Sequence, residues 1–224
     1  MLPQSADLPL RTRPVRAIVI HTATAVFARK VAQDIGTDDP ARLGDGAVAR
    51  YERLELPFYG HVLVDGAGAP HWLAPVDRVA WHTAPLADFY ATDRWRLWAR
   101  PPGEGWTRHG RDPARVWDWW DARWPGVESP RLLATGRQPN DVSIGVDLLP
   151  TVDGEFTPCQ MQAANRLVLD LCCDHDVPHL RGYVLGHEDV DPCGRGAVRR
   201  RGIIYGVPWD PGPRLDWTLL GLES

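Results

Sequence analysis

Short apolar runs rich in β-branched residues alternate along this chain with longer stretches of helical spacing. Residues 16–22 read RAIVIHT and residues 142–150 read VSIGVDLLP, and both runs are typical of buried strands. Residues 158–175 place apolar side chains three and four positions apart, and Thr157 followed by Pro158 marks a helix start. Strands alternating with helices predict a single mixed α/β domain over residues 1–224.

The remaining elements carry weaker signals. We expect helices at 25–34, 47–56 and 215–222, a strand at 183–185, and a hairpin with strands at 61–64 and 71–73. The hairpin turns at Asp65-Gly66, a pair that is common in tight turns. A polar turn is expected after the first helix, and a basic loop at 199–201.

Composition and charge exclude several classes of partner. The chain has 224 residues, 44% of them hydrophobic, and a formal net charge of −4. Such a chain has no overall basic field to attract nucleic acid or an anionic membrane. No stretch approaches the roughly 18 apolar residues of a membrane span.

Prolines and charges interrupt the first residues, and the apolar run AIVI is too short for the core of a signal peptide. The sequence therefore predicts a chain that begins in the cytoplasm.

Two histidines end apolar strands, His21 in IVIH and His187 in YVLGH. Together with Asp210, in the rigid stretch WDPGP, they would supply two imidazole nitrogens and one carboxylate oxygen. That set suits a catalytic Zn²⁺, which takes three protein ligands and keeps one position open. Two alternatives stay open from the residues alone: a strand-end histidine is also an ordinary half-buried side chain, and Asp is a common turn residue.

Six short stretches in order carry a resemblance to a known family. They are VIHTA, GHVLVDGAGAPHWLAP, AWHTA, NDVSIGVDLL, VLGHEDVDP and DPGPRLDW. In this order they resemble the zinc-dependent N-acetylmuramoyl-L-alanine amidases, the type 2 amidase fold shared with peptidoglycan recognition proteins. The resemblance covers residues 16–87 and 140–218, and it implies a central mixed β-sheet flanked by helices, with a zinc cleft on one face.

The resemblance also implies roles for single residues. His21, His187 and Asp210 match the zinc ligands. Asp147, in IGVD, matches a glutamate that takes a proton from the attacking water, and it is one methylene shorter. Its alternative is a strand-end carboxylate that bonds a neighbouring turn. Trp81 and His82 match a segment bordering the cleft, so we expect them to line the substrate site or to support the ligands.

Two positions depart from the family pattern. The family commonly has a lysine two residues before the zinc aspartate, where it stabilises the oxyanion, and this chain has Pro208. Four arginines precede Pro208: Arg195, Arg199, Arg200 and Arg201. One of them would have to replace the lysine. The alternative is that they form a solvated basic loop. Some relatives place a tyrosine at the site from the strand that carries His61, and the aligned position here is Gly60, with Tyr59 one residue off.

Residues 89–138 look like an insertion, and they hold seven of the eleven tryptophans. Trp117, Trp119 and Trp120 would stack on sugar faces in a glycan groove. The alternatives are an apolar core of the insertion itself, or a lid or partner surface.

The resemblance thus implies a zinc hydrolase that cleaves the amide between N-acetylmuramic acid and L-alanine in peptidoglycan or muropeptides. Two rival hypotheses remain: a peptidoglycan-binding module with little or no turnover, which Pro208 favours, and a zinc hydrolase of another amide. Without a signal peptide, the site of action is either the cytoplasm or the cell wall after lysis or dedicated secretion. The sequence points to no protein partner.

Overall fold

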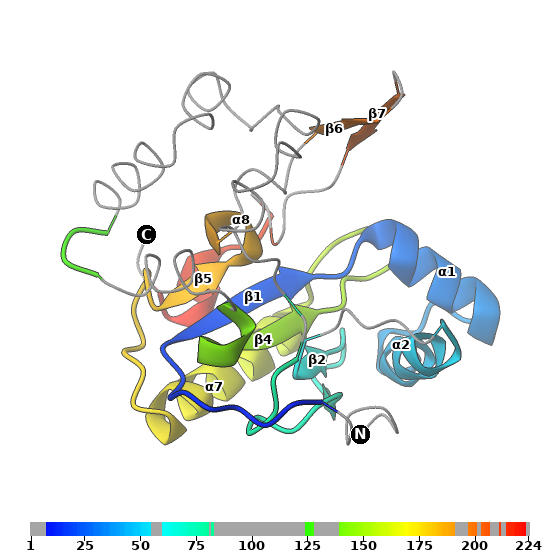
Figure 1. Ribbon diagram of the computed structural model, residues 1–224. Coiled ribbons are helices and arrows are strands. Elements are labelled where there is room, and N and C mark those ends of the chain that lie inside the picture. Colours follow the sequence, from blue (N-terminus) through cyan, green and yellow to red (C-terminus); the bar gives the residue numbers. More distant parts are fainter. Residues whose placement is uncertain are drawn as a thin grey trace.

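The computed structural model describes residues 8–54, 60–80, 82, 124–127, 139–190, 197–200, 203–206, 211 and 214–222. Its centre is a five-stranded sheet with the strand order β3-β2-β4-β1-β5 (Figure 1). These strands are β1 (Ala17–Thr22), β2 (Val62–Val64), β3 (Pro70–Trp72), β4 (Ser143–Leu148) and β5 (Val184–Gly186). Neighbouring strands are parallel except β2 and β3, which form the antiparallel hairpin. The predicted mixed sheet is confirmed.

Helix α7 (Pro158–Asp174) covers one face of this sheet (Figure 1). Alternate residues of the strands point at it, among them Ile18, Ile20, Ile144 and Val146, and all four are fully buried. Thr157 begins the helix as predicted: its Oγ1 accepts a hydrogen bond from the backbone N–H of Gln160 at 3.0 Å. The main hydrophobic core therefore lies between α7 and the sheet.

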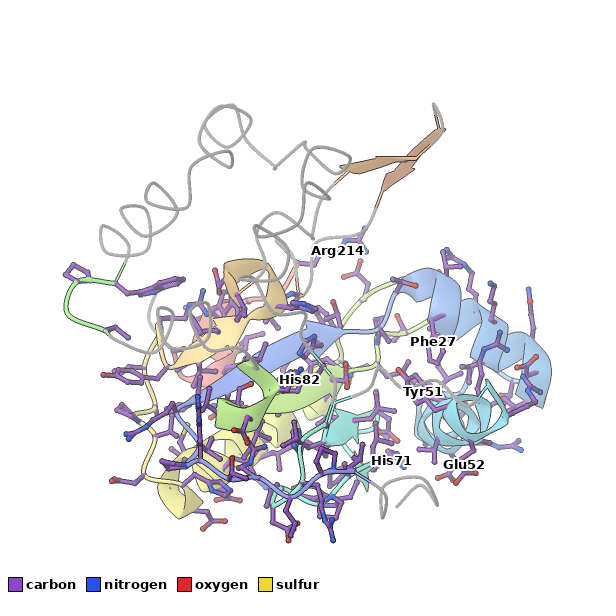
Figure 2. The ribbon with its side chains drawn as sticks, viewed as in Figure 1. Phe27, Tyr51, Glu52, His71, His82 and Arg214 are labelled. Atoms are coloured by element: carbon purple, nitrogen blue, oxygen red, sulfur yellow. The ribbon has the colours of Figure 1, made fainter. Side chains whose placement is uncertain are left out.

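Helices α1 (Ala25–Ile35) and α2 (Pro40–Leu54) pack against each other beside the β2–β3 hairpin (Figure 1). Phe27 and Tyr51 stack between them, with ring centroids 5.2 Å apart (Figure 2). A second core joins these helices to Leu63 and Leu149.

Helix α2 begins well before the predicted residue 47. Asp39 starts it, because its carboxylate accepts from the backbone N–H of Ala41 at 3.0 Å, and Pro40 takes the first helical position. The part of α2 before residue 47 contains Gly44 and Gly46, and glycine is uncommon inside helices. In the fold they allow close packing: a Cβ at Gly46 would come within 2.8 Å of Val31.

The C-terminal part differs from the prediction in two further places. The helix expected at 215–222 is a short 3₁₀ helix, η4 (Trp217–Leu220), which ends at Gly221 in a left-handed conformation. Of the basic loop expected at 199–201, Arg199 and Arg200 lie in a strand, β6 (Ala197–Arg200). This strand forms a hairpin with β7 (Ile203–Gly206). Two other short elements frame the site: η3 (Pro139–Val142) precedes β4, and α8 (His187–Val190) follows β5.

Within residues 89–138 the structure describes residues 124–127, and the tryptophans proposed to stack on sugars lie outside the described residues. The insertion and the single-domain boundary stay predictions. Of the helices in the described ranges, none is both long enough and apolar enough to cross a membrane.

Candidate metal centre

The two strand-end histidines lie side by side on the face of the sheet opposite α7. β1 and β5 are parallel neighbours with Ile20 opposite Gly186. The next residues in the chain, His21 and His187, therefore lie at the same edge of the sheet. The rings of His21 and His187 have centroids 4.5 Å apart and cross at 71°. Both side chains are buried, with 4% and 3% of their surface exposed. The fold therefore pairs the two imidazoles that the sequence singled out.

A third histidine, His82, contacts this pair. Its Nδ1 lies 3.0 Å from Nε2 of His21, and the two rings meet edge to face. Its Nε2 faces Ser143, with the carbonyl oxygen at 3.4 Å and Oγ at 3.2 Å. Figure 2 shows His82 over the sheet beside β4. His82 is thus a buried neighbour of His21, and Trp81, which the sequence paired with it, lies outside the described residues.

Gly145 makes room for the His82 ring. A Cβ at this position would lie 2.7 Å from Cγ of His82, closer than atoms can approach. The backbone N–H of His82 is held from the other side, by Oδ1 of Asn140 at 3.1 Å. The glycine of the IGVD stretch therefore has a steric reason that the sequence alone did not reveal.

Burial lowers the pKa of His82 well below its ordinary value. The neighbouring histidines, His21 first among them, lower it further, because a positive charge at His82 would be repelled by theirs. His82 is therefore a neutral imidazole near neutral pH.

His61 contacts the backbone of β4 at Gly145. Its Nδ1 accepts from the backbone N–H of Gly145 at 3.0 Å, so Nε2 carries the proton and donates to the carbonyl of Arg78 at 3.0 Å. Burial, with the charge of Arg11 nearby, lowers the pKa of His61 to about 3. No role for this histidine was expected from the sequence, and its neutral ring bonds the backbone of β4 at Gly145.

Asp147 is the register partner of His21 across β1 and β4, so both side chains lie on the same face. Its Oδ2 accepts from the backbone N–H of Gly60 at 2.7 Å. Any Cβ at Gly60 would collide with this oxygen. The chain therefore has no room at Gly60 for the tyrosine seen in some relatives, and the backbone there orients the carboxylate instead.

A buried ion pair holds the turn that presents His187. Oδ2 of Asp189 accepts from the backbone N–H of Gly186 at 2.8 Å and from Nη2 of Arg181 at 2.9 Å. The Arg181 guanidinium lies 3.6 Å from the Trp217 ring centroid and 5.6 Å from that of Trp124. Because Asp189 stands two residues after His187 in HEDV, its position in the motif was the one signal that could have revealed it.

The third predicted ligand, Asp210, lies outside the described residues, as does Pro208. Pro211, which follows Asp210 in the chain, is described. Its carbonyl lies 3.4 Å from the Thr22 hydroxyl, and a Cβ at Gly186 would come within 2.6 Å of its Cδ. The chain next to Asp210 thus reaches the ends of β1 and β5.

The described residues include part of a donor set for a metal. Across the part of the chain that the structure describes, no three His, Cys, Asp or Glu side chains converge as metal ligands. The described residues supply His21 and His187, two adjacent buried imidazoles, and imidazole nitrogen is a favoured zinc ligand. The residues present fit a zinc site that a third ligand would complete.

Two solved structures are similar to the chain. The crystal structure of a selenomethionine AmpD derivative has 18% sequence identity and a TM-score of 0.47, and the match covers 98% of this chain and 89% of that one. A mutant endolysin from Bacillus subtilis has 17% identity and a TM-score of 0.45, with 87% and 86% covered. The comparison with curated proteins found no match.

The family model described as N-acetylmuramoyl-L-alanine amidase matches residues 11–213, which include His21, Asp147 and His187. The chain belongs to the N-acetylmuramoyl-L-alanine amidase family.

Proposed function

We propose that the chain is a zinc-dependent peptidoglycan amidase. Its substrate would be the amide between the lactyl group of N-acetylmuramic acid and the first L-alanine of the stem peptide. The observation that carries the proposal is the pairing of His21 and His187, 4.5 Å apart between ring centroids, in a chain of the amidase family. Peptidoglycan or a muropeptide fragment would be its partner.

Three residues would hold the metal: His21, His187 and Asp210. When bound, zinc supplies Lewis-acid chemistry, because it polarises a carbonyl oxygen and lowers the pKa of water toward ~7. The prolines around Asp210 limit the freedom of its loop, which suits a ligand that must be held still.

Asp147 would act as the general base. It lies in register with His21, and the Gly60 N–H at 2.7 Å orients its carboxylate. In the proposed reaction Asp147 takes a proton from the attacking water as the water oxygen bonds to the carbonyl carbon. The C–N bond then breaks, and the proton passes to the departing amine of L-alanine.

The test is product analysis by mass spectrometry after incubation of purified protein with muropeptides. We expect wild type to release a stem peptide with a free L-alanine amine. Asp147→Asn should lower kcat by about 10²- to 10⁴-fold, the usual contribution of a general base. Asp153→Asn, an exposed turn carboxylate, is the matched control and should keep wild-type activity.

A second candidate function rests on Pro208, which stands where the family commonly has a lysine. If no other group replaces that cation, the chain would bind peptidoglycan with little or no turnover. Zinc-loaded wild type that binds muropeptides but releases no peptide would establish the module and refute the amidase. Cleavage of simple acyl amides but not of muropeptides would point to another amide substrate.

A further inference from the structure

Residues 124–127, which belong to the tryptophan-rich stretch 89–138, pack on the turn that precedes β5. They form a turn of their own, closed by the backbone N–H of Val127 and the carbonyl oxygen of Trp124 at 3.2 Å. A Cβ at Gly182 would lie 3.1 Å from Cγ of Trp124 and 3.2 Å from Cγ1 of Val127. Glycine at this position therefore leaves room for both side chains, and Trp124 keeps only 7% of its surface exposed.

The Trp124 ring also covers a buried cation. The Arg181 side chain is 7% exposed, and its Cζ lies over two indole rings, 5.6 Å from the Trp124 centroid and 3.6 Å from that of Trp217. A guanidinium within about 6 Å of an aromatic centroid is attracted to the ring face. An ion pair is weaker in water than in protein, so a loss of the Trp124 ring would weaken the attraction between Arg181 and Asp189.

Arg181 connects the tryptophan contact with the backbone beside His187. Its Nη1 donates to the carbonyl oxygen of Val184 at 2.8 Å, and its Nη2 donates to Oδ2 of Asp189 at 2.9 Å. The same oxygen accepts from the Gly186 N–H at 2.8 Å. Gly186 directly precedes His187 in the chain, so the Asp189 carboxylate decides how the turn presents His187.

We propose that Trp124 is a positioning residue for the metal centre: its ring keeps water from the Arg181–Asp189 ion pair, and that pair fixes the turn that carries His187. This inference rests on the proposed zinc function. It gives the tryptophan-rich stretch, which lies outside the family resemblance, a role in holding a metal ligand.

Three variants separate this role from a general effect on stability. Trp124→Leu keeps an apolar side chain and removes the ring, whereas Trp124→Phe keeps a ring over the guanidinium. Tyr51→Leu is the matched control, because it removes an aromatic ring from the packing of α1 against α2, beside the hairpin at the opposite edge of the sheet from β5 (Figure 1).

The first test follows hydrogen exchange of the Gly186 N–H by NMR in zinc-free protein. We expect exchange to be about three- to tenfold faster in Trp124→Leu, since a cation–π contact of this kind contributes about that factor. Trp124→Phe and Tyr51→Leu should stay within about twofold of wild type. Unchanged exchange in Trp124→Leu, or equal acceleration in Tyr51→Leu, would overturn the inference.

The second test measures zinc affinity of the same proteins by competition with a chelator. Loss of a group that holds a ligand usually weakens metal binding about 10- to 100-fold, and Trp124 lies further from the metal than such a group. We therefore expect Trp124→Leu to bind zinc about three- to tenfold more weakly, with Trp124→Phe and Tyr51→Leu within about twofold of wild type. Equal affinities in wild type and Trp124→Leu would overturn the inference.

Circular dichroism checks that each variant folds. If Trp124→Leu does not, Trp124→Met, an adaptable apolar side chain without a ring, takes its place with the same expectations. Failure of the proposed function looks different: wild type would bind no zinc, whereas exchange of the Gly186 N–H would still decide whether Trp124 holds the turn.

Discussion

At the residue scale, Arg11 shows how much of the site depends on one side chain far away in the sequence. A guanidinium has five N–H donors, and those of Arg11 meet five backbone carbonyl oxygens at 2.7–3.2 Å. The acceptors belong to Val76, Arg78, Asn140, Asp141 and Ser143. Arg11 thereby joins the N-terminal segment to the loop after β3 and to the start of β4, which are the two segments that place His82.

We expect Arg11→Lys to lower the free energy of unfolding by at least about 2 kcal/mol. An ammonium has three donors, so two carbonyls lose their partner, and each buried unpaired group costs about 1–3 kcal/mol. Urea unfolding followed by circular dichroism measures the change. The control is Arg13→Lys, whose side chain is 60% exposed and lies 3.7 Å from Asp141, and it should change stability by less than about 0.5 kcal/mol. Equal losses in both variants would contradict this account.

His61 should make stability depend on pH. Its pKa is lowered to about 3 in the fold, whereas an unfolded histidine titrates near ~6.5. The unfolded chain therefore binds more protons below that value, so this contribution is complete above about pH 6.5 and is lost as the pH falls toward 3.

The slope from one such histidine is about 1 kcal/mol for each pH unit. His61→Asn keeps an acceptor for the Gly145 N–H and removes the titration. Urea unfolding from pH 6.5 to 5 should show the slope fall by about that amount in the variant. An unchanged slope would rule out His61 as a source of the pH dependence.

At the element scale, the turn between β5 and α8 decides where His187 points. We expect Asp189→Ala to lower the free energy of unfolding by about 3 kcal/mol, because it leaves the buried Arg181 without its carboxylate 2.9 Å away. It should also weaken zinc binding about tenfold, since the Gly186 N–H loses its acceptor. Thermal unfolding and chelator competition measure the two effects. Asp153→Ala is the exposed control. Equal zinc affinity in Asp189→Ala and Asp153→Ala would show that Asp189 has no effect on the site.

The elements predicted best are those whose signals are local. Thr157 and Pro158 start α7 from adjacent positions, and the apolar runs of β1 and β4 read directly as strands. The start of α2 was predicted wrongly because Gly44 and Gly46 look like turn residues. Their reason is contact with distant residues: a Cβ at Gly44 would collide with His71.

At the scale of the whole molecule, the two faces of the sheet have different tasks. One face packs its Ile and Val side chains against α7 and supplies the main core. The other places His21, His82 and His187 together, with Asp147 beside them. A parallel arrangement of β4, β1 and β5 brings the carboxyl ends of all three strands to one edge, so the rigid core directly positions the site.

The same difference between local and distant signals applies to the site. His21 and His187 could be named from sequence because each ends an apolar strand, and Asp147 and His82 because their stretches resemble those of the family. The His21–His82 contact joins residues 61 positions apart, and those of Arg11 with η3 and β4 span 129 to 132. No short stretch of sequence records such contacts, so the partners of His82 and the role of Arg11 emerged only with the fold.

The central claim is that zinc, held by His21 and His187, makes this chain an amidase. The most direct test strips the protein with a chelator and returns zinc in steps, while metal content and stem-peptide release from muropeptides are followed in the same samples. We predict that activity rises in proportion to bound zinc and saturates near one ion per chain, and that His187→Ala neither retains zinc nor regains activity. Full activity in the stripped protein, or in the variant, would contradict the account.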